Sequence, residues 1–241
     1  MLFLFSDFGL QGPYAGEMEA AARRHSQQTP IHLMHDAPSF EPGAAGLLLR
    51  ALSRQFQPGD ICVAVVDPGV GGARCPVCLL ADGIYYVGPD NGLLAPLADH
   101  ASRHEWWEIT WRPEQLSASF HGRDLFAPFA AQLQTGMSPT AIGAQPLHDP
   151  VSTDSVSDQI IYVDGFGNCV TGLLADDVPR SSQLMVNGKA ITRARSFCDV
   201  PPGQSFWYRN SMDLVEIAAN QDSAAALLEL TVGTSVSVDR G

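Results

Sequence analysis

The sequence has no long apolar run. None of the apolar stretches in its 241 residues approaches the roughly 20 residues needed for a membrane-spanning helix. Its opening, "MLFLFSDFGL", has five residues before a polar Ser-Asp pair and no basic lead, which is too short for a signal peptide. We therefore expect a soluble protein of the cytoplasm.

Basic residues and cysteines are also scarce. Lys and Arg number 14 against 26 Asp and Glu, giving a net charge of −12. That charge repels phosphate backbones and argues against nucleic acid as a partner, whereas a cationic small molecule is favoured. Five cysteines are an odd number, which fits a reducing compartment rather than a secreted disulfide scaffold. The pair Cys75 and Cys78 has CxxC spacing but no second CxxC, so we expect a structural role.

Several common signatures of catalysis and metal binding are absent. There is no G-x-S-x-G elbow, and the glycine-rich "VVDPGVGGAR" is neither a P-loop nor a G-x-G-x-x-G fingerprint. His32 and His35 are three residues apart rather than four, and in a strand such positions face opposite ways. We therefore expect no metal.

The first half alternates short apolar runs with helical patterns, which predicts an α/β sheet with functional loops at the carboxyl ends of its strands. Asp82 and Gly83 form a turn dipeptide between two strands of this half. The expected strands are 2–5, 31–34, 60–67, 75–81, one beginning at 84, and 106–110, and the expected helices are 13–25, 42–56 and 122–136.

The composition changes at residues 148–158, which are polar and rich in serine. We place a linker there, between an N-terminal domain (1–150) and a C-terminal domain (157–241). The second half is mostly short strand-like segments with one helical stretch at 222–230. The fold class is therefore an N-terminal α/β domain with a central, mostly parallel sheet, followed by a smaller C-terminal β-barrel-like domain.

Polar side chains stand where predicted strands of the first half end. Asp7 follows the first strand and can accept hydrogen bonds from a ribose diol, although a helix cap or turn would also explain it. Asp67 follows the most apolar strand, and Arg74 lies beyond its glycine-rich loop. Asp90 and Asn91 precede an expected helix, where ordinary capping accounts for them.

The stretch "SFHGRDLFAPFAA" brings three ionisable groups to one helix start, where a single capping residue is usual. These groups are His121, Arg123 and Asp124. In the second half, "VDGFGNCVTG" has Phe166 between two glycines and Asn168 after them. A plain β-turn explains the glycines, whereas the aromatic ring and the amide together suit a nucleobase.

Six segments occur in the order found in one family: "SDFGLQGPYAG", "VVDPGVGGAR", "VGPDNGLL", "FHGRDLFAPFAA", "VDGFGNCVTG" and "NSMDLVEIAANQDSAA". From residue 2 to its C-terminus the chain resembles the S-adenosylmethionine hydroxide adenosyltransferases, relatives of fluorinase and chlorinase. The resemblance implies a homotrimer. S-adenosylmethionine would bind between the N-terminal domain of one subunit and the C-terminal domain of its neighbour.

The resemblance also assigns roles to residues. Asp67, Arg74 and His121 match a catalytic Asp-Arg-His set that replaces the halide pocket of halogenating relatives, while Arg123 and Asp124 organise the helix start. The implied substrate contacts are Asp7 to the ribose hydroxyls, Phe40 as an aromatic wall, Asn168, Ala219 and Gln221 to adenine, and Asp164 and Ser211 to the methionine end. The chain departs from the family at Gly12, where an acid is frequent.

The implied reaction converts S-adenosylmethionine and water into adenosine and L-methionine, with no cofactor. Arg74 would favour hydroxide character in the water, Asp67 would orient the other two groups, and the proton acceptor stays open between His121 and the network as a whole. Two alternatives remain. One is halide-dependent adenosyl transfer, which Asp67 and His121 disfavour, and the other is a non-catalytic adenosine or S-adenosylmethionine sensor.

Overall fold

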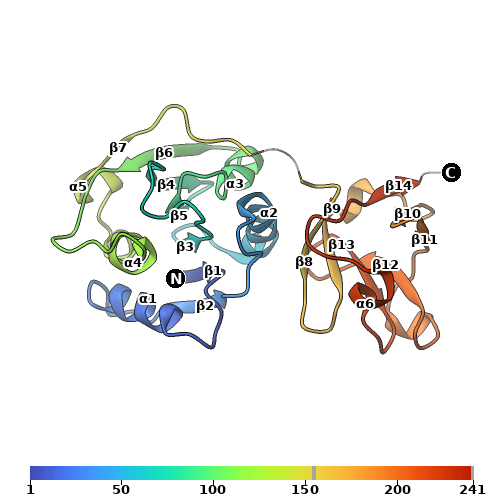
Figure 1. Cartoon of the computed structure of the whole chain (residues 1–241). Coiled ribbons are helices and arrows are strands. Elements are labelled where there is room, and N and C mark those ends of the chain that lie inside the picture. Colours follow the sequence, from blue (N-terminus) through green and yellow to red (C-terminus); the bar gives the residue numbers. More distant parts are fainter. Residues whose placement is uncertain (154–155, 240–241) are drawn as a thin grey trace. The chain divides into compact units, whose positions relative to one another are not determined.

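The computed structural model describes residues 1–153 and 156–239 (Figure 1). It divides into two compact units, residues 1–49 with 55–153 and residues 50–54 with 154–241. Residues 154 and 155 of the expected linker lie outside the described residues. No helix of the described residues is long and apolar enough to cross a membrane.

The described residues of the N-terminal unit form a seven-stranded sheet in the order β2-β1-β3-β5-β4-β6-β7. Strands β2, β1, β3 and β5 run parallel, whereas β4 pairs antiparallel with both β5 and β6. The predicted turn joins β4 to β5, and both its residues, Asp82 (φ 47°) and Gly83 (φ 87°), adopt the left-handed conformation of a tight hairpin. The expected α/β class is confirmed. The strands are β1 (Leu2–Ser6), β2 (Ile31–Met34), β3 (Ile61–Val65), β4 (Pro76–Ala81), β5 (Ile84–Pro89), β6 (His104–Ile109) and β7 (Ala144–Pro146).

Helices cover both faces of this sheet (Figure 1). On one face, Leu4 and Val63 share a core with Met18 of α1 and Phe129 of α4. On the other, Phe3 stacks on Phe56 with ring centroids 4.1 Å apart. Burial on both faces explains why the central strands read as continuous apolar runs. The helices are α1 (Tyr14–Arg23), α2 (Pro42–Leu52), α3 (Ala95–His100), α4 (Ala127–Gln134) and α5 (Pro139–Ile142), with a 3₁₀ turn at Ser53–Gln55.

The helix expected at 122–136 begins in an unusual way. Its first part, η2 (Gly122–Phe126), is a π-helix that continues directly as α4. A π-turn widens the helix locally, and such turns are frequent at functional sites. His121 stands at its N-cap.

The described residues of the C-terminal unit form two antiparallel sheets, β12-β13-β9-β8 and β11-β10-β14. Isolated bridges join their edges, Gln159 to Ser235 and Arg193 to Trp207, so the strands close into a ring. Trp207 and Ile217 are fully buried in its core. This closure bears out the barrel-like expectation. The elements are β8 (Ile160–Val163), β9 (Cys169–Leu174), β10 (Gln183–Val186), β11 (Lys189–Ile191), β12 (Ser205–Arg209), β13 (Leu214–Ala219), α6 (Ala224–Leu228) and β14 (Ser237–Asp239), with 3₁₀ turns at Ala175–Asp177 and Phe197–Asp199.

Candidate functional site

The N-terminal sheet changes direction between β1 and β3. From β1 the chain proceeds to β2 on one side and then crosses back to β3 on the other. In open α/β sheets, ligands bind outside the carboxyl ends of the strands at such a switch point. Asp7 directly follows β1 and Asp67 lies two residues beyond β3, so the sheet itself brings both carboxylates to that place.

Asp67, Arg74 and His121 form one cluster. Arg74 Nε lies 3.0 Å from both carboxylate oxygens of Asp67, and a second guanidinium nitrogen also contacts Oδ2. That nitrogen, Nη2, lies 2.7 Å from His121 Nδ1. The Asp67 side chain is only 4% exposed and that of Arg74 only 10%, so this ion pair is held away from water. Arg74 therefore contacts both of the other side chains predicted to be catalytic.

The contact with Arg74 determines the protonation of His121. A guanidinium group only donates hydrogen bonds, so Nδ1 of His121 must accept, and the neutral ring carries its proton on Nε2. Burial and the Arg74 charge both lower the pKa of His121 from its ordinary value of 6.5, which keeps the ring neutral. At neutral pH, His121 therefore presents an N–H donor at Nε2.

Asp7 and Phe40 line a small cavity of about 80 Å³ together with Asp67 and His121. Burial raises the pKa of Asp7, and backbone amides of Asp7 itself and of Phe40 oppose that shift by hydrogen bonding to the charged form. The Phe40 ring is 74% exposed and its φ is +65°. This small cavity thus joins the predicted ribose acid and the predicted aromatic wall to the charged cluster.

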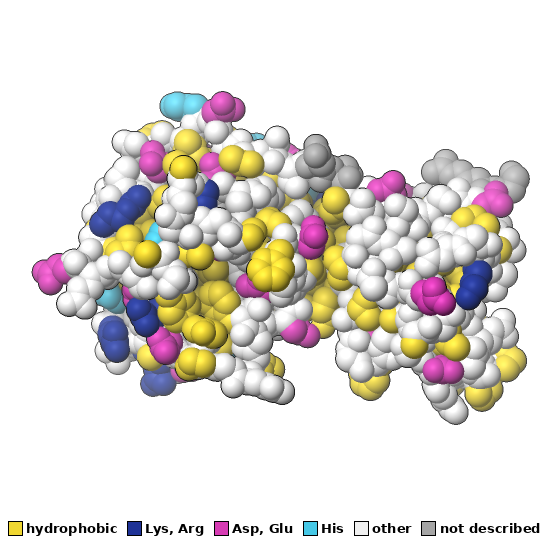
Figure 2. All heavy atoms as spheres, in the orientation of Figure 1, with side chains coloured by type: hydrophobic (Ala, Val, Ile, Leu, Met, Phe, Trp, Pro, Cys, Tyr) yellow, Lys and Arg dark blue, Asp and Glu magenta, His cyan; other side chains and the backbone are white. Residues whose placement is uncertain are grey.

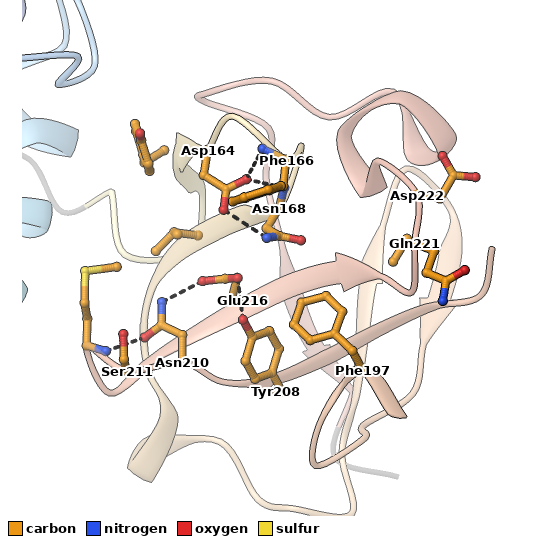
Figure 3. Close-up of a pocket in the computed structure, with 14 residues that line it drawn as sticks. Asp164, Phe166, Asn168, Phe197, Tyr208, Asn210, Ser211, Glu216, Gln221 and Asp222 are labelled. Carbon is orange, nitrogen blue, oxygen red and sulfur yellow. Dashed lines mark hydrogen bonds between the residues drawn. The ribbon is translucent and has the colours of Figure 1, made fainter. Parts of the chain in front are cut away.

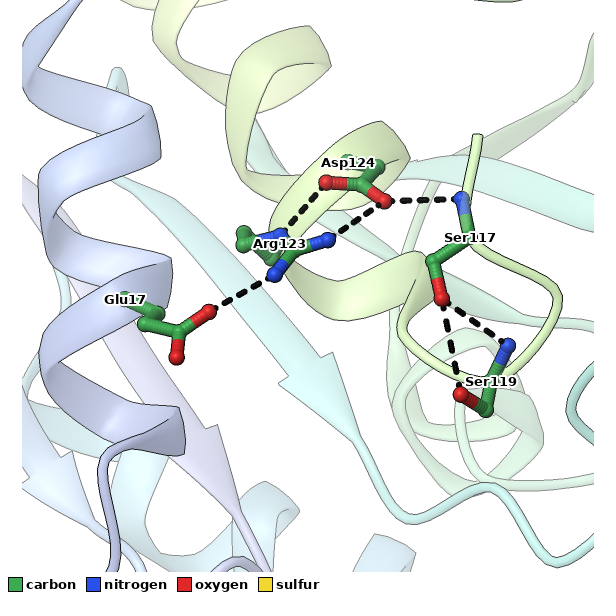
Figure 4. A network of polar contacts seen from close by, with 5 residues as sticks. All are labelled: Glu17, Ser117, Ser119, Arg123 and Asp124. Atoms are coloured by element: carbon green, nitrogen blue, oxygen red, sulfur yellow. Dashed lines mark hydrogen bonds and ion pairs between the residues drawn. The ribbon is translucent and has the colours of Figure 1, made fainter. Parts of the chain in front are cut away.

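Arg123 and Asp124 organise the helix start, as expected (Figure 4). The Arg123 guanidinium donates to Asp124 (2.6 and 3.0 Å) and to Glu17 of α1 (2.7 Å), and the Ser117 amide donates to Asp124 (2.8 Å). These bonds hold the loop before η2 against α1 and thereby fix the backbone that carries His121.

The capping role considered for Asp90 and Asn91 is wrong. Helix α3 begins at Ala95, with Leu94 at its N-cap position. Asp90 instead accepts a hydrogen bond from the Val151 amide (2.9 Å), and Asn91 donates to the Val66 carbonyl (2.9 Å). Asn91 therefore helps to fix the residue immediately before Asp67.

The C-terminal unit contains a larger cavity of about 880 Å³ (Figure 3). It lies over the outer side of β8, β9, β12 and β13, and aromatic rings of Phe166, Phe197 and Tyr208 stand around it. The structure brings all the predicted contact residues of this half to its lining, namely Asp164, Asn168, Ser211, Ala219 and Gln221.

Asp164 holds the turn between β8 and β9. Its carboxylate accepts hydrogen bonds from the amides of Phe166 and Asn168 and from the Asn168 side-chain nitrogen, each at 2.9 Å. Gly167 has φ +82°, and a Cβ there would lie 2.0 Å from Ser223 Oγ, so the position requires glycine. The turn thus fixes Asn168 and leaves the Phe166 ring 83% exposed beside the cavity.

Sequence reasoning missed a buried acid in this lining. Glu216 is 6% exposed; it accepts hydrogen bonds from the Tyr208 hydroxyl (2.6 Å) and from Asn210 Nδ2 (2.8 Å). Asn210 Oδ1 in turn accepts from the amides of Met212 and Leu214, which shapes the loop that carries Ser211. The signal was available, because Glu216 is the one charge within the apolar strand "LVEIA".

The cavity has a negative lining. Asp164, Glu216 and Asp222 contribute carboxylates, and none of the described lining residues is Lys or Arg. Such a lining favours a cation. On the face of the molecule in Figure 2, the Lys and Arg side chains are separate spots rather than a continuous patch.

His32 and His35 do not face opposite ways, so that prediction is also wrong. The register of β2 against β1 shifts at Leu33, β2 ends at Met34 and the chain bends at His35, and His32 Nδ1 lies 2.6 Å from His35 Nε2. Among the described residues, no group of three or more His, Cys, Asp and Glu side chains is arranged to hold a metal ion. Cys75 and Cys78 are free thiols, and Cys78 is buried in β4 within the core, as a structural role requires.

Comparison with known proteins gives the class of this fold and site. Residues 2–143 match the N-terminal domain of the SAM (S-adenosylmethionine) hydroxide adenosyltransferases, and residues 158–237 match the C-terminal domain of the same family. The chain belongs to the SAM hydroxide adenosyltransferase family.

Individual relatives cover nearly the whole chain. An (R)-S-adenosyl-L-methionine hydrolase of Thermus thermophilus is 34% identical over 98% of both chains. One of Salinispora arenicola is 35% identical over 98% of this chain and 96% of its own. A crystal structure of an uncharacterized conserved protein from Thermotoga maritima superposes with a TM-score of 0.90 at 28% identity, covering both chains completely.

Proposed function

We propose that the protein hydrolyses S-adenosyl-L-methionine to adenosine and L-methionine by in-line attack of water at C5′. The observation that carries the proposal is the Asp67–Arg74–His121 cluster beside Asp7 at the switch point of the sheet. Family membership and two full-length relatives named (R)-S-adenosyl-L-methionine hydrolase support it.

The reaction needs little from the protein except position and polarity. As water oxygen bonds to C5′, the C5′–S bond breaks and its electron pair neutralises the sulfonium, giving the thioether of methionine. The oxygen loses one proton to become the 5′-hydroxyl, so one proton is released overall. Because the sulfonium is already a good leaving group, the proposal includes no cofactor, and the protein places water opposite sulfur.

The geometry supports a proposal of distinct roles for the three clustered side chains. His121 donates its Nε2–H to the water oxygen and positions it, since its Nδ1 is already occupied by Arg74. This arrangement disfavours His121 as the initial proton acceptor. Arg74 stabilises the developing hydroxide, and Asp67 fixes Arg74 through two oxygens.

Recognition of the substrate is divided between the two halves of the predicted residue set. The Asp7 carboxylate accepts hydrogen bonds from the ribose hydroxyls, and the Phe40 ring packs against the sugar. In the C-terminal cavity, Asn168 and the backbones of Ala219 and Gln221 bind adenine, while Asp164 and Ser211 bind the methionine end. The acidic lining suits a substrate that carries a sulfonium and an ammonium. Because Gly12 provides no carboxylate, the ammonium depends more heavily on this lining.

Incubation with S-adenosylmethionine in halide-free buffer tests the proposal. We expect adenosine and methionine in equal amounts by chromatography, with the (R) sulfonium epimer consumed. Intact substrate would indicate the sensor, and a 5′-halogenated nucleoside formed only on addition of halide would indicate halide-dependent transfer.

The five free thiols fit our placement of this reaction in the reducing cytoplasm.

We further propose a homotrimer in which these two half-sites, from neighbouring subunits, form each active site. A cavity of about 80 Å³ is too small for a substrate of this size, for which pockets of roughly 300–1,000 Å³ are usual. Mixing an Asp7→Ala chain with a Ser211→Ala chain should then restore activity, because some interfaces receive two intact halves. If subunits exchange but activity does not return, each site is built within one chain.

A further inference from the structure

A chain of hydrogen bonds runs from the end of β1 to the surface of α1. Ser6 Oγ lies 2.6 Å from His35 Nδ1, His35 Nε2 lies 2.6 Å from His32 Nδ1, and His32 Nε2 lies 3.0 Å from Glu19 Oε2. Ser6 is fully buried and His35 is 2% exposed, whereas the His32 side chain is 34% exposed. Burying histidine and hydroxyl groups costs free energy unless they are hydrogen-bonded, and this chain gives each buried group a partner.

The hydrogen bonds of this Ser6–His35–His32–Glu19 chain all point the same way, each group donating to the next. The Glu19 carboxylate only accepts, so His32 donates to it from Nε2, and in its neutral form it accepts from His35 at Nδ1. His35 therefore carries its proton on Nε2 and accepts a hydrogen bond at Nδ1 from the Ser6 hydroxyl. The Ser6 oxygen in turn accepts a hydrogen bond from the Phe8 amide at 3.4 Å. Burial and the neighbouring His32 lower the pKa of His35, which agrees with a neutral ring.

His35 stands between the two loops that carry the ribose half-site. The Gly9 amide donates to the His35 carbonyl (2.6 Å), and the Ala37 amide donates to the Ser6 carbonyl (3.1 Å). The second loop continues to Phe40, whose amide stabilises the Asp7 carboxylate. The side-chain bond between Ser6 and His35 therefore ties the residue before Asp7 to the loop that ends at Phe40.

We propose that His35, supported by His32 and Glu19, is a positioning residue that fixes Asp7 and Phe40 for binding of the substrate ribose. The proposal rests on the proposed function. His35 touches no reacting atom, so its loss acts on binding rather than on the chemical step. The outer groups act by fixing the tautomer and orientation of His35, as carboxylates commonly do for histidine.

Variants at position 35 test the proposal. We expect His35→Ala to raise KM for S-adenosylmethionine and Kd for adenosine about tenfold, with kcat changed less than threefold. His35→Asn places an oxygen where Nδ1 accepts from Ser6 and should recover most of that loss. His32→Ala should give an intermediate rise, because it cuts the chain but keeps the Ser6–His35 bond.

Asp60→Ala is the matched control. Asp60 is another buried polar residue beside the same sheet, 4% exposed, but it lies immediately before β3, where it accepts a hydrogen bond from the Gln57 amide at 2.8 Å. Its loss should lower Tm without changing KM. A KM unchanged in His35→Ala, or raised equally in Asp60→Ala, would overturn the proposal.

Hydrogen exchange separates this proposal from the proposed function. If the wild-type protein cleaves no S-adenosylmethionine, the proposed function fails, yet amide protection at residues 6–9 and 35–40 still reports on the network. We expect that protection to fall in His35→Ala and to return in His35→Asn. Equal protection in all three proteins would refute positioning by His35. If His35→Ala does not fold, the same comparison is made between His32→Ala and wild type.

Discussion

The two cavities differ in size, charge and construction. The one at the switch point of the N-terminal sheet is small, and it is lined by a buried carboxylate, Asp67, that is paired with an arginine. The one on the C-terminal barrel is about 880 Å³, with aromatic rings and three carboxylates. The first has room for a few atoms beside fixed charges, whereas the lining of the second suits a large cation. On this account, the α/β unit performs the chemistry and the barrel supplies most of the recognition.

Removing the charged cluster should have the largest effect. Arg74→Ala or His121→Ala should lower kcat by roughly 10²–10⁴ with a small change in KM, because these groups act on the water. His121→Gln can present an N–H near the Nε2 position, so it should keep more activity than His121→Ala. If glutamine and alanine are equally inactive, His121 is a base rather than a donor. Steady-state kinetics decides both points.

Asp7→Ala should come next and should act on binding. Losing a half-buried carboxylate that accepts hydrogen bonds from two ribose hydroxyls costs on the order of 2–4 kcal/mol, or about 30- to 1,000-fold in Kd. Calorimetry with adenosine measures it directly, and Asp7→Asn is the control that keeps an acceptor oxygen. Unchanged affinity in Asp7→Ala would remove Asp7 from the site.

Glu216→Gln tests the recognition half. The change removes one negative charge and one of the two hydrogen bonds that Glu216 accepts from Tyr208 and Asn210. We expect about tenfold weaker binding of S-adenosylmethionine and a smaller loss for uncharged adenosine. Equal losses for both ligands in calorimetry would assign Glu216 to loop structure alone.

Acidification should have the smallest effect. The pKa of His121 and that of His35 are both lowered by burial from the ordinary value of 6.5, so below about pH 6.5 the unfolded chain binds more protons than the native protein. The contribution of these two histidines to the free energy of unfolding should therefore be constant above that pH and fall beneath it, by at most about 1.4 kcal/mol per pH unit for each histidine. Denaturant titrations between pH 7.5 and 5.5 measure this slope, and His35→Asn should reduce it. A flat profile would contradict the neutral assignments.

The fold and the predicted residue set were accessible from sequence for identifiable reasons. Continuous apolar strands, the Asp82-Gly83 turn and strand-end carboxylates are local patterns, and they predicted the sheet and the neighbourhood of Asp7 and Asp67. The wrong predictions concern contacts made where chain direction changes. A register shift at Leu33 and a bend after Met34 bring His32 and His35 together, and Asn91 turns toward the carbonyl of Val66 instead of capping α3. Local periodicity says nothing about such bends.

The central claim, that water attacks C5′ directly, is tested by turnover in ¹⁸O-labelled water. Mass spectrometry of the products should find one ¹⁸O in adenosine, at its 5′-hydroxyl, and none in methionine. The label in adenosine should be as abundant as in the solvent, and its rate of appearance should fall in His121→Ala. Adenosine without label would contradict the account, because its 5′-oxygen would then come from a source other than solvent.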